Sequence, residues 1–179
     1  MLAGAGARVT AVDASAEMLR VAEARARARG TAVDFRMGDA HHLDFRNGSF
    51  DTVVSLRVLM HTPDWRQCLA EACRVARTRV IVDYPAAASV AALQAATRHV
   101  AHRLGARTEP YRVFTDRQIR ETLSSHGFRV TRAHRQFVLP IAVHKRLNSR
   151  AFTLGVERAL QSVGLLALAG SPVTILAER

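Results

Sequence analysis

Short apolar runs recur along the chain and predict the strands of a sheet. The runs Val9–Val12 and Phe50–Leu56 show no alternation, which is typical of interior parallel strands. Between them, Val33, Phe35 and Met37 alternate with charged residues, as expected of a strand at a sheet edge. Further strands are predicted over residues 80–85, 128–139 and 172–177.

Helical signals fill the intervals between these strands. Ser15 is a good N-cap, Glu17 places a negative charge in the first turn, and Gly30 is a typical residue just beyond a helix end. Thr115 gives a second cap, and Gly127 ends the helix that it begins. The predicted helices cover residues 15–29, 64–75, 89–104, 115–125 and 149–169.

The order of these elements predicts an α/β fold. Repeated βα units joined by short loops imply a Rossmann-like, mostly parallel sheet with helices on both faces. A chain of 179 residues fits one domain, and no internal repeat or linker divides it.

Composition narrows the classes of function. The formal charge is +11, but Lys145 is the only lysine and the arginines are scattered without interleaved aromatic residues, so nucleic acid is not the expected partner. Cys68 and Cys73 form no Cys-x-x-Cys pattern, which fits a reduced, cytoplasmic setting. No apolar run reaches the roughly 18–20 residues of a transmembrane helix, and no secretion signal is evident.

Two acidic residues close neighbouring predicted strands. Asp13 follows the run Val9–Val12, and Asp39 follows the strand over residues 33–37. The carboxyl ends of parallel strands meet at the crevice where open α/β sheets bind nucleotides. One carboxylate can accept hydrogen bonds from a ribose diol and the other can orient an adenine, so the pattern predicts a nucleoside-bearing cofactor.

Four segments together carry a family resemblance. The segments 9–19, 38–45 and 49–61 resemble the second-, third- and fourth-strand motifs of class I S-adenosylmethionine-dependent methyltransferases, and 71–75 resembles the next helix. The similarity is to the small-molecule "type 11" group and is specific over residues 7–85. It implies S-adenosyl-L-methionine as the cofactor, a small-molecule acceptor with a lipid-like one left open, and an antiparallel last strand.

The resemblance also implies roles for individual residues. Asp13 would hold the ribose hydroxyls, Met18 would pack on the adenine, and Asp39 would receive the adenine amino group. His61 is the candidate catalytic base on the substrate side, with a loop histidine that moves no proton as the alternative. The expected cofactor-binding set is Asp13, Ala14, Met18, Gly38, Asp39, Ala40, Ser55, Leu56 and Arg57.

The family's first strand and its Gly-x-Gly-x-Gly loop have no counterpart in these residues. Gly4 and Gly6 lie before the second strand, so Met1 is expected to be an internal methionine and residues 1–179 a single methyltransferase domain lacking its N-terminal strand and most of its first helix. The family's strand order, 3-2-1-4-5-7-6, then leaves a gap of about 9.6 Å between strands normally about 4.8 Å apart. We expect the chain to be poorly stable, or its second strand to pair with its fourth.

Other interpretations stay open. A nicotinamide-dependent oxidoreductase also binds ribose with an acid after its second strand, and a degenerate scaffold without cofactor is the non-enzymatic alternative. His41, His42, His99 and His102 lack a convergent third ligand, so no metal site is predicted. An apolar stripe within 154–166 near Lys145 leaves peripheral membrane contact open. The sequence names neither the acceptor nor the oligomeric state, although residues 86–150 are expected to shape acceptor choice.

Overall fold

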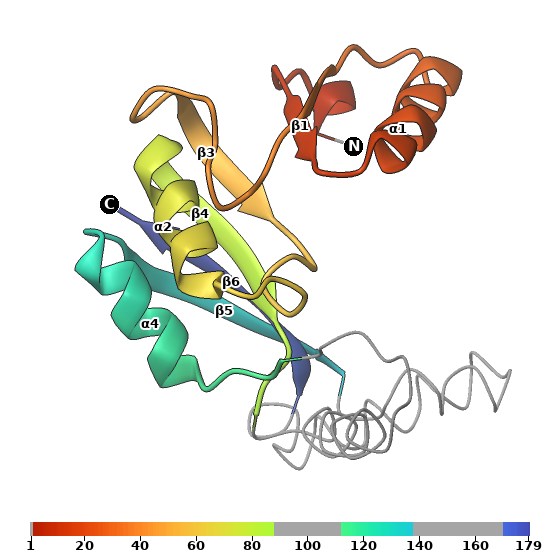
Figure 1. Ribbon diagram of the computed structural model, residues 1–179. Helices are drawn as coiled ribbons and strands as arrows, with labels where there is room; N and C mark the ends of the chain where they lie inside the picture. The colour runs from red at the N-terminus through yellow and green to blue at the C-terminus, as the bar shows by residue number, and fades with distance from the viewer. Residues whose placement is uncertain (1, 88–111, 138–169) are drawn as a thin grey trace, which may run out of the picture. The chain divides into compact units, whose positions relative to one another are not determined.

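The computed structural model describes residues 2–87, 112–137 and 170–179 (Figure 1). The chain divides into two compact units, Met1–Arg46 and Asn47–Arg179. The helices predicted over 89–104 and 149–169 lie outside the described residues, as do His99, His102 and Lys145. Among the described helices, none combines the length and the apolar character that a membrane crossing needs.

The first unit is a small βαβ arrangement. It contains a short 3-10 helix η1 (Ala3–Ala5), strand β1 (Thr10–Asp13), helix α1 (Ala16–Ala28) and strand β2 (Asp34–Met37). The two strands pair in parallel, with Thr10 opposite Asp34 and Asp13 opposite Met37. Both strands therefore end at the same edge, as the sequence predicted.

Helix α1 begins and ends where its local signals place it. The Ser15 side chain accepts a hydrogen bond from the Met18 main-chain N–H at 3.3 Å, and Glu17 lies in the first turn. Gly30 has φ of 60°, a left-handed conformation that a residue without Cβ adopts at little cost. These contacts confirm both predicted helix ends.

The first unit has no interior of its own. None of the described residues up to Arg46 is buried. Met18 on α1 is 54% exposed and Met37 on β2 is 71% exposed, although the alternation of apolar residues predicted a covered face for β2. Strand pairing and helix capping, rather than side-chain burial, are what hold this unit together.

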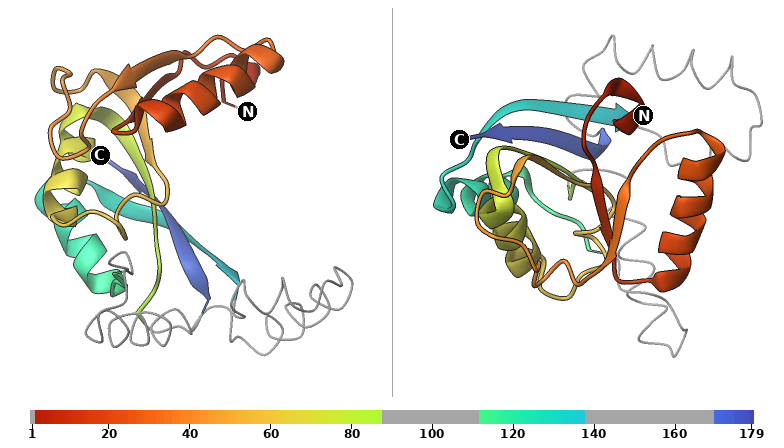
Figure 2. Two further views of the ribbon diagram at one scale, coloured as in Figure 1. Left: turned by 45° about the vertical axis from the view of Figure 1, so that its right-hand side comes forward. Right: turned by 90° about the horizontal axis from the view of Figure 1, so that it is seen from above.

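The second unit is a four-stranded mixed sheet with two described helices. Its strands run in the order β3-β4-β6-β5, with β3 and β4 parallel and β6 antiparallel to both neighbours. Helices α2 and α4 pack beside each other on one face of this sheet (Figures 1 and 2). The elements are β3 (Phe50–Ser55), α2 (Trp65–Val75), β4 (Ala76–Tyr84), α4 (Asp116–Ser125), β5 (Arg129–Phe137) and β6 (Ser171–Glu178).

The core of the second unit lies between the sheet and these two helices. Alternate residues of β4 and β6 are buried, and so are the inner faces of α2 and α4. Phe114, just before α4, meets the rings of Trp65 and Tyr84 edge-on at centroid distances of 5.2 and 6.2 Å. Edge-to-face packing of this kind adds about 0.5–1.5 kcal/mol per pair beyond the burial itself.

Strand β4 starts four residues earlier than predicted. The sequence predicted a strand over residues 80–85, but the strand begins at Ala76, where α2 ends. Thr78 donates a hydrogen bond to the Asp51 carbonyl at 2.7 Å, and Arg77 pairs with the Asp51 carboxylate at 2.6 Å. These contacts draw the segment alongside β3, so it becomes part of the strand.

The second and fourth strands of the family pattern correspond to β1 and β3, which belong to different units. Among the described residues, β1 pairs with β2 and β3 pairs with β4, and each has one strand neighbour. Strand β4, by contrast, has β3 on one side and β6 on the other. Each of β1 and β3 therefore has one side along which no strand is paired within the described ranges.

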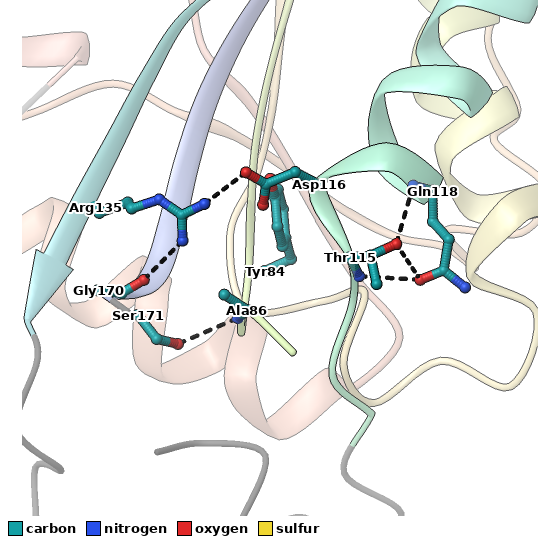
Figure 3. A network of polar contacts seen from close by, with 8 residues as sticks. All are labelled: Tyr84, Ala86, Thr115, Asp116, Gln118, Arg135, Gly170 and Ser171. Carbon is teal, nitrogen blue, oxygen red and sulfur yellow. Dashed lines mark hydrogen bonds and ion pairs between the residues drawn. The ribbon is translucent and has the colours of Figure 1, made fainter. Parts of the chain in front are cut away.

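A polar network ties the ends of several elements of the second unit together (Figure 3). The buried Tyr84 donates to Asp116 at 2.9 Å, and Arg135 donates to the same carboxylate at 2.5 Å and to the Gly170 carbonyl at 3.2 Å. Burial, and then the charge of Asp116, raise the pKa of Tyr84 far above its ordinary value. This tyrosine is therefore a structural hydrogen-bond donor.

We expect the amides of β1 and β2 to exchange with solvent hydrogen faster than those of Val80–Val82. The reason is that no described residue of the first unit is buried, and local opening is easiest where few apolar contacts must be broken. Hydrogen exchange followed by mass spectrometry compares both regions in one sample. Equal protection of the two regions would contradict this view of the first unit.

Tyr84→Phe should lower the free energy of unfolding by about 1–3 kcal/mol, because it removes a buried hydrogen bond to a charged acceptor. Urea denaturation measures the change. Arg117→Ala is the matched control, since its ion pair with Glu121 is exposed to solvent and should change the free energy of unfolding little. A Tyr84→Phe protein as stable as the control would show that the network carries no stability.

Candidate cofactor-binding edge

Asp13 lies at the carboxyl end of β1, where the chain turns into α1. Its Oδ1 accepts a hydrogen bond from the Ser15 N–H at 2.8 Å, and the residue is exposed. The bond fixes the carboxylate at the turn, and Oδ2 accepts none from the described residues. Ala14 follows Asp13 in this turn, Met18 lies in the first turn of α1, and both residues are exposed. The second oxygen of Asp13 is therefore placed to accept a hydrogen bond from a ligand.

Gly38 joins the ends of the two strands of the first unit. Its N–H donates to the Asp13 carbonyl at 3.1 Å, which carries the parallel pairing one residue past β2. A Cβ at this position would lie 3.0 Å from a methyl group of Val12, so a larger residue would require that side chain to move by a small amount. Gly38 thus keeps Asp39 and Ala40 close to the Asp13 end of the sheet.

Asp39 is held by a tight turn with His41. Its Oδ1 accepts the His41 main-chain N–H at 2.9 Å and lies 2.7 Å from His41 Nδ1. The main-chain bond is the larger cause, and the ring bond the second, of a pKa of Asp39 below its ordinary value. Asp39 therefore stays an anion well into the acidic range, with its side chain 65% exposed.

Ser55, Leu56 and Arg57 lie in the second unit, at the carboxyl end of β3. Leu56 is 51% exposed, and Arg57 has φ of 61°. The Arg57 N–H donates to Asp83 Oδ1 at 2.5 Å. The predicted cofactor segment thus turns out of the sheet through a left-handed residue held by a carboxylate.

His61 lies in a turn that follows this segment. Its N–H donates to the Val58 carbonyl at 3.0 Å, and the residue is exposed while Met60 and Thr62 on either side are buried. The main chain at His61 is therefore held by this turn and by its buried neighbours. No group of three or more metal-ligating side chains occurs in the described part of the chain.

Sequence reasoning missed Asp83. The run Val80–Tyr84 has the pattern of a buried strand. An acidic residue within such a strand is unusual, and it is the sequence signal that could have identified Asp83. What the sequence could not reveal is the partner, because Arg57 is 26 residues away along the chain. The structure supplies that partner by pairing β3 with β4 in parallel.

Residues 1–82 match the model of the family described as "Methyltransferase domain". Among curated relatives, an uncharacterized protein of Mycobacterium bovis is 43% identical over 73 residues, which are 41% of this chain and 27% of that protein. Methyltransferase GfsG of Streptomyces halstedii is 36% identical over 74 residues, 40% of this chain and 27% of that protein. The matches thus span about a quarter of the length of these relatives.

Solved structures extend the likeness across the chain. A SAM-dependent methyltransferase from Methanosarcina mazei is 18% identical with a TM-score of 0.68, covering 99% of this chain and 84% of that one. Magnesium protoporphyrin IX methyltransferase from Synechocystis PCC 6803, crystallised with SAH, is 20% identical with a TM-score of 0.62 and coverages of 99% and 67%. The [4+2]-cyclase SpnF is 18% identical with a TM-score of 0.61 and coverages of 96% and 66%.

The chain therefore has the Rossmann-like α/β fold of class I methyltransferases, with an antiparallel last strand. Its first 82 residues match the methyltransferase-domain family. Both predictions from the sequence are confirmed.

We expect His41→Ala to raise the pKa of Asp39 only part of the way to its ordinary value. The ring bond is lost, but the larger main-chain bond from residue 41 remains. The pKa of Asp39 is lower in the folded chain than in the unfolded chain. The stabilising contacts of the Asp39 carboxylate with residue 41 are therefore fully present above the ordinary carboxyl pKa and are lost as pH falls through the lowered pKa. An NMR titration of the Asp39 carboxyl in both proteins measures this, with Asp39→Asn identifying the signal. No rise in the variant would show that the ring does not act on Asp39.

Proposed function

We propose that these residues belong to an S-adenosylmethionine-dependent methyltransferase acting on a small-molecule acceptor. The observation that carries the proposal is the placement of Asp13 and Asp39 at one edge of the β1–β2 sheet, within the part of the chain that matches the methyltransferase family. The fold by itself would not carry it, because the same fold is found in SpnF, a [4+2]-cyclase.

The donor set at this edge fits the nucleoside half of the cofactor. Asp13 Oδ2 would accept from a ribose hydroxyl, and the Asp39 carboxylate would accept from the adenine amino group. Met18, 54% exposed on the first turn of α1, would supply an apolar surface for the adenine ring. The lowered pKa of Asp39 keeps it an acceptor rather than a donor, as an amino group requires.

The remaining expected residues come from the second unit. Ser55, Leu56 and Arg57 would line the cofactor with their main chain, and the exposed Leu56 side chain would exclude water. When bound, the sulfonium of the cofactor supplies an electrophilic methyl group, so the protein's task is to align an acceptor in line with it. His61, exposed on an anchored turn, would take a proton from a hydroxyl or acidic carbon acceptor.

We also propose that the sheet is completed by a further parallel strand, with a glycine-rich turn, from outside these residues. The edges of β1 and β3 that have no strand partner among the described residues support this, as does the finding that no described residue of the first unit is buried. Residues 1–179 would then form most of one methyltransferase domain. Two buried free cysteines support a reduced, cytoplasmic setting.

Calorimetric binding of S-adenosylhomocysteine tests the proposal, on this chain and on a chain extended by the residues encoded upstream. Asp13→Asn and Asp39→Asn should each weaken binding about 10- to 100-fold, because each replaces a charged hydrogen-bond acceptor. Asp34→Asn is the matched control, since Asp34 lies at the opposite end of β2 and pairs with Arg36.

Three results would contradict the proposed function. Binding by neither form would favour a scaffold without cofactor, and binding of NADH in place of S-adenosylhomocysteine would favour an oxidoreductase. Equal losses in Asp34→Asn would show that the effect is not specific to the carboxyl edge. Binding by the extended form alone would support the completing strand.

A further inference from the structure

Asp83 is an acid in the interior of the second unit. It is the penultimate residue of β4, 5% exposed, between the fully buried Val82 and Tyr84. No cation of the described residues forms an ion pair with it. A buried carboxylate without a countercharge is costly, and it needs strong hydrogen bonds to be retained. Stability alone would be served better by an apolar residue here.

The recorded partner of Asp83 is the main chain of Arg57. The Arg57 N–H donates to Asp83 Oδ1 at 2.5 Å, a short bond to a charged acceptor. Arg57 is also the only described residue other than glycine with positive φ, at 61°. That conformation is unfavourable for a residue with a Cβ, so some contact must hold it in place.

The register of the strands explains what the bond does. Ser55 is the last residue of β3 and lies opposite Val82, so continued pairing would carry residues 56 and 57 along the end of β4. The Asp83 side chain instead takes the Arg57 N–H. The ladder stops there, and the chain leaves the sheet through the left-handed residue, toward the turn that carries His61.

We propose that Asp83 is a positioning residue for the cofactor: it holds Arg57 in the left-handed conformation and thereby sets the path of Ser55–Leu56–Arg57 along the cofactor. This rests on the proposed function, which places that segment against the ligand. Without the carboxylate, Arg57 relaxes to negative φ, and the peptide groups on either side of it rotate. The segment then no longer presents the same surface to the ligand.

The experiment pairs two measurements on each variant. Residue-specific hydrogen exchange by NMR reports on the Arg57 amide without any ligand, and calorimetry gives the Kd for S-adenosylhomocysteine in the form of the chain that binds it. Asp83→Ala should speed exchange of the Arg57 amide at least 10-fold and raise the Kd about 10-fold. Asp51→Ala, at the opposite end of β3, is the matched control and should change neither.

A second substitution separates positioning from general stability. Glycine adopts positive φ without penalty, so Arg57→Gly combined with Asp83→Ala should recover most of the lost affinity. A role for Asp83 in packing alone predicts no such rescue. Asp83→Asn, which keeps an oxygen acceptor but loses the charge, should raise the Kd about threefold, and it serves if Asp83→Ala does not fold.

The outcomes are distinguishable. Unchanged exchange of the Arg57 amide in Asp83→Ala and Asp83→Asn would overturn the proposal, as would faster exchange with an unchanged Kd or a failed rescue by glycine. Failure of the proposed function is a different result, namely that neither this chain nor the extended chain binds S-adenosylhomocysteine without any substitution, and the proposal for Asp83 would then fall with it.

Discussion

Buried main-chain N–H and C=O groups must find hydrogen-bond partners, and strand β4 is where the second unit meets this requirement most fully. It pairs with β3 on one side and β6 on the other, and Arg79–Val82 have a strand partner along both edges. Side chains from α2 and α4 can then cover one face of a continuous sheet. At its carboxyl end, Asp83 and Tyr84 extend the same principle to side chains by bonding Arg57 and Asp116.

The first unit meets the requirement only locally. Its strands bond each other, its helix is capped by Ser15, and its described residues bury no side chain. A parallel pair and one helix provide too little apolar contact for an interior, because the hydrophobic contribution to stability scales with the area removed from water. The same edge carries Asp13 and Asp39, so the proposed ligand-binding carboxylates belong to the part with the least internal support.

The chemistry of the candidate site is built from short-range turns. Asp13 accepts from the N–H two residues on, and so does Asp39, which leaves the second oxygen of each for a ligand. Gly38 keeps the two turns together because its lack of a Cβ lets it approach Val12. The contact made by Asp83 is different because it joins the ends of two strands. The carboxylate therefore sets the direction of the main chain at Ser55–Leu56–Arg57 and does not only orient one local turn.

The sequence by itself determined every element whose cause is local. The caps at Ser15, Asp64 and Thr115, the glycine at residue 30 and the apolar runs of β1 and β3 each act within a few residues, so the helix and strand limits they imply agree with the structure. The family motif placed Asp13 and Asp39 for the same reason. Only the tertiary structure decided that β4 begins at Ala76, that β1 and β3 pair elsewhere, and that Asp83 meets Arg57. Those outcomes depend on hydrogen bonds between residues tens of positions apart, which no local pattern specifies.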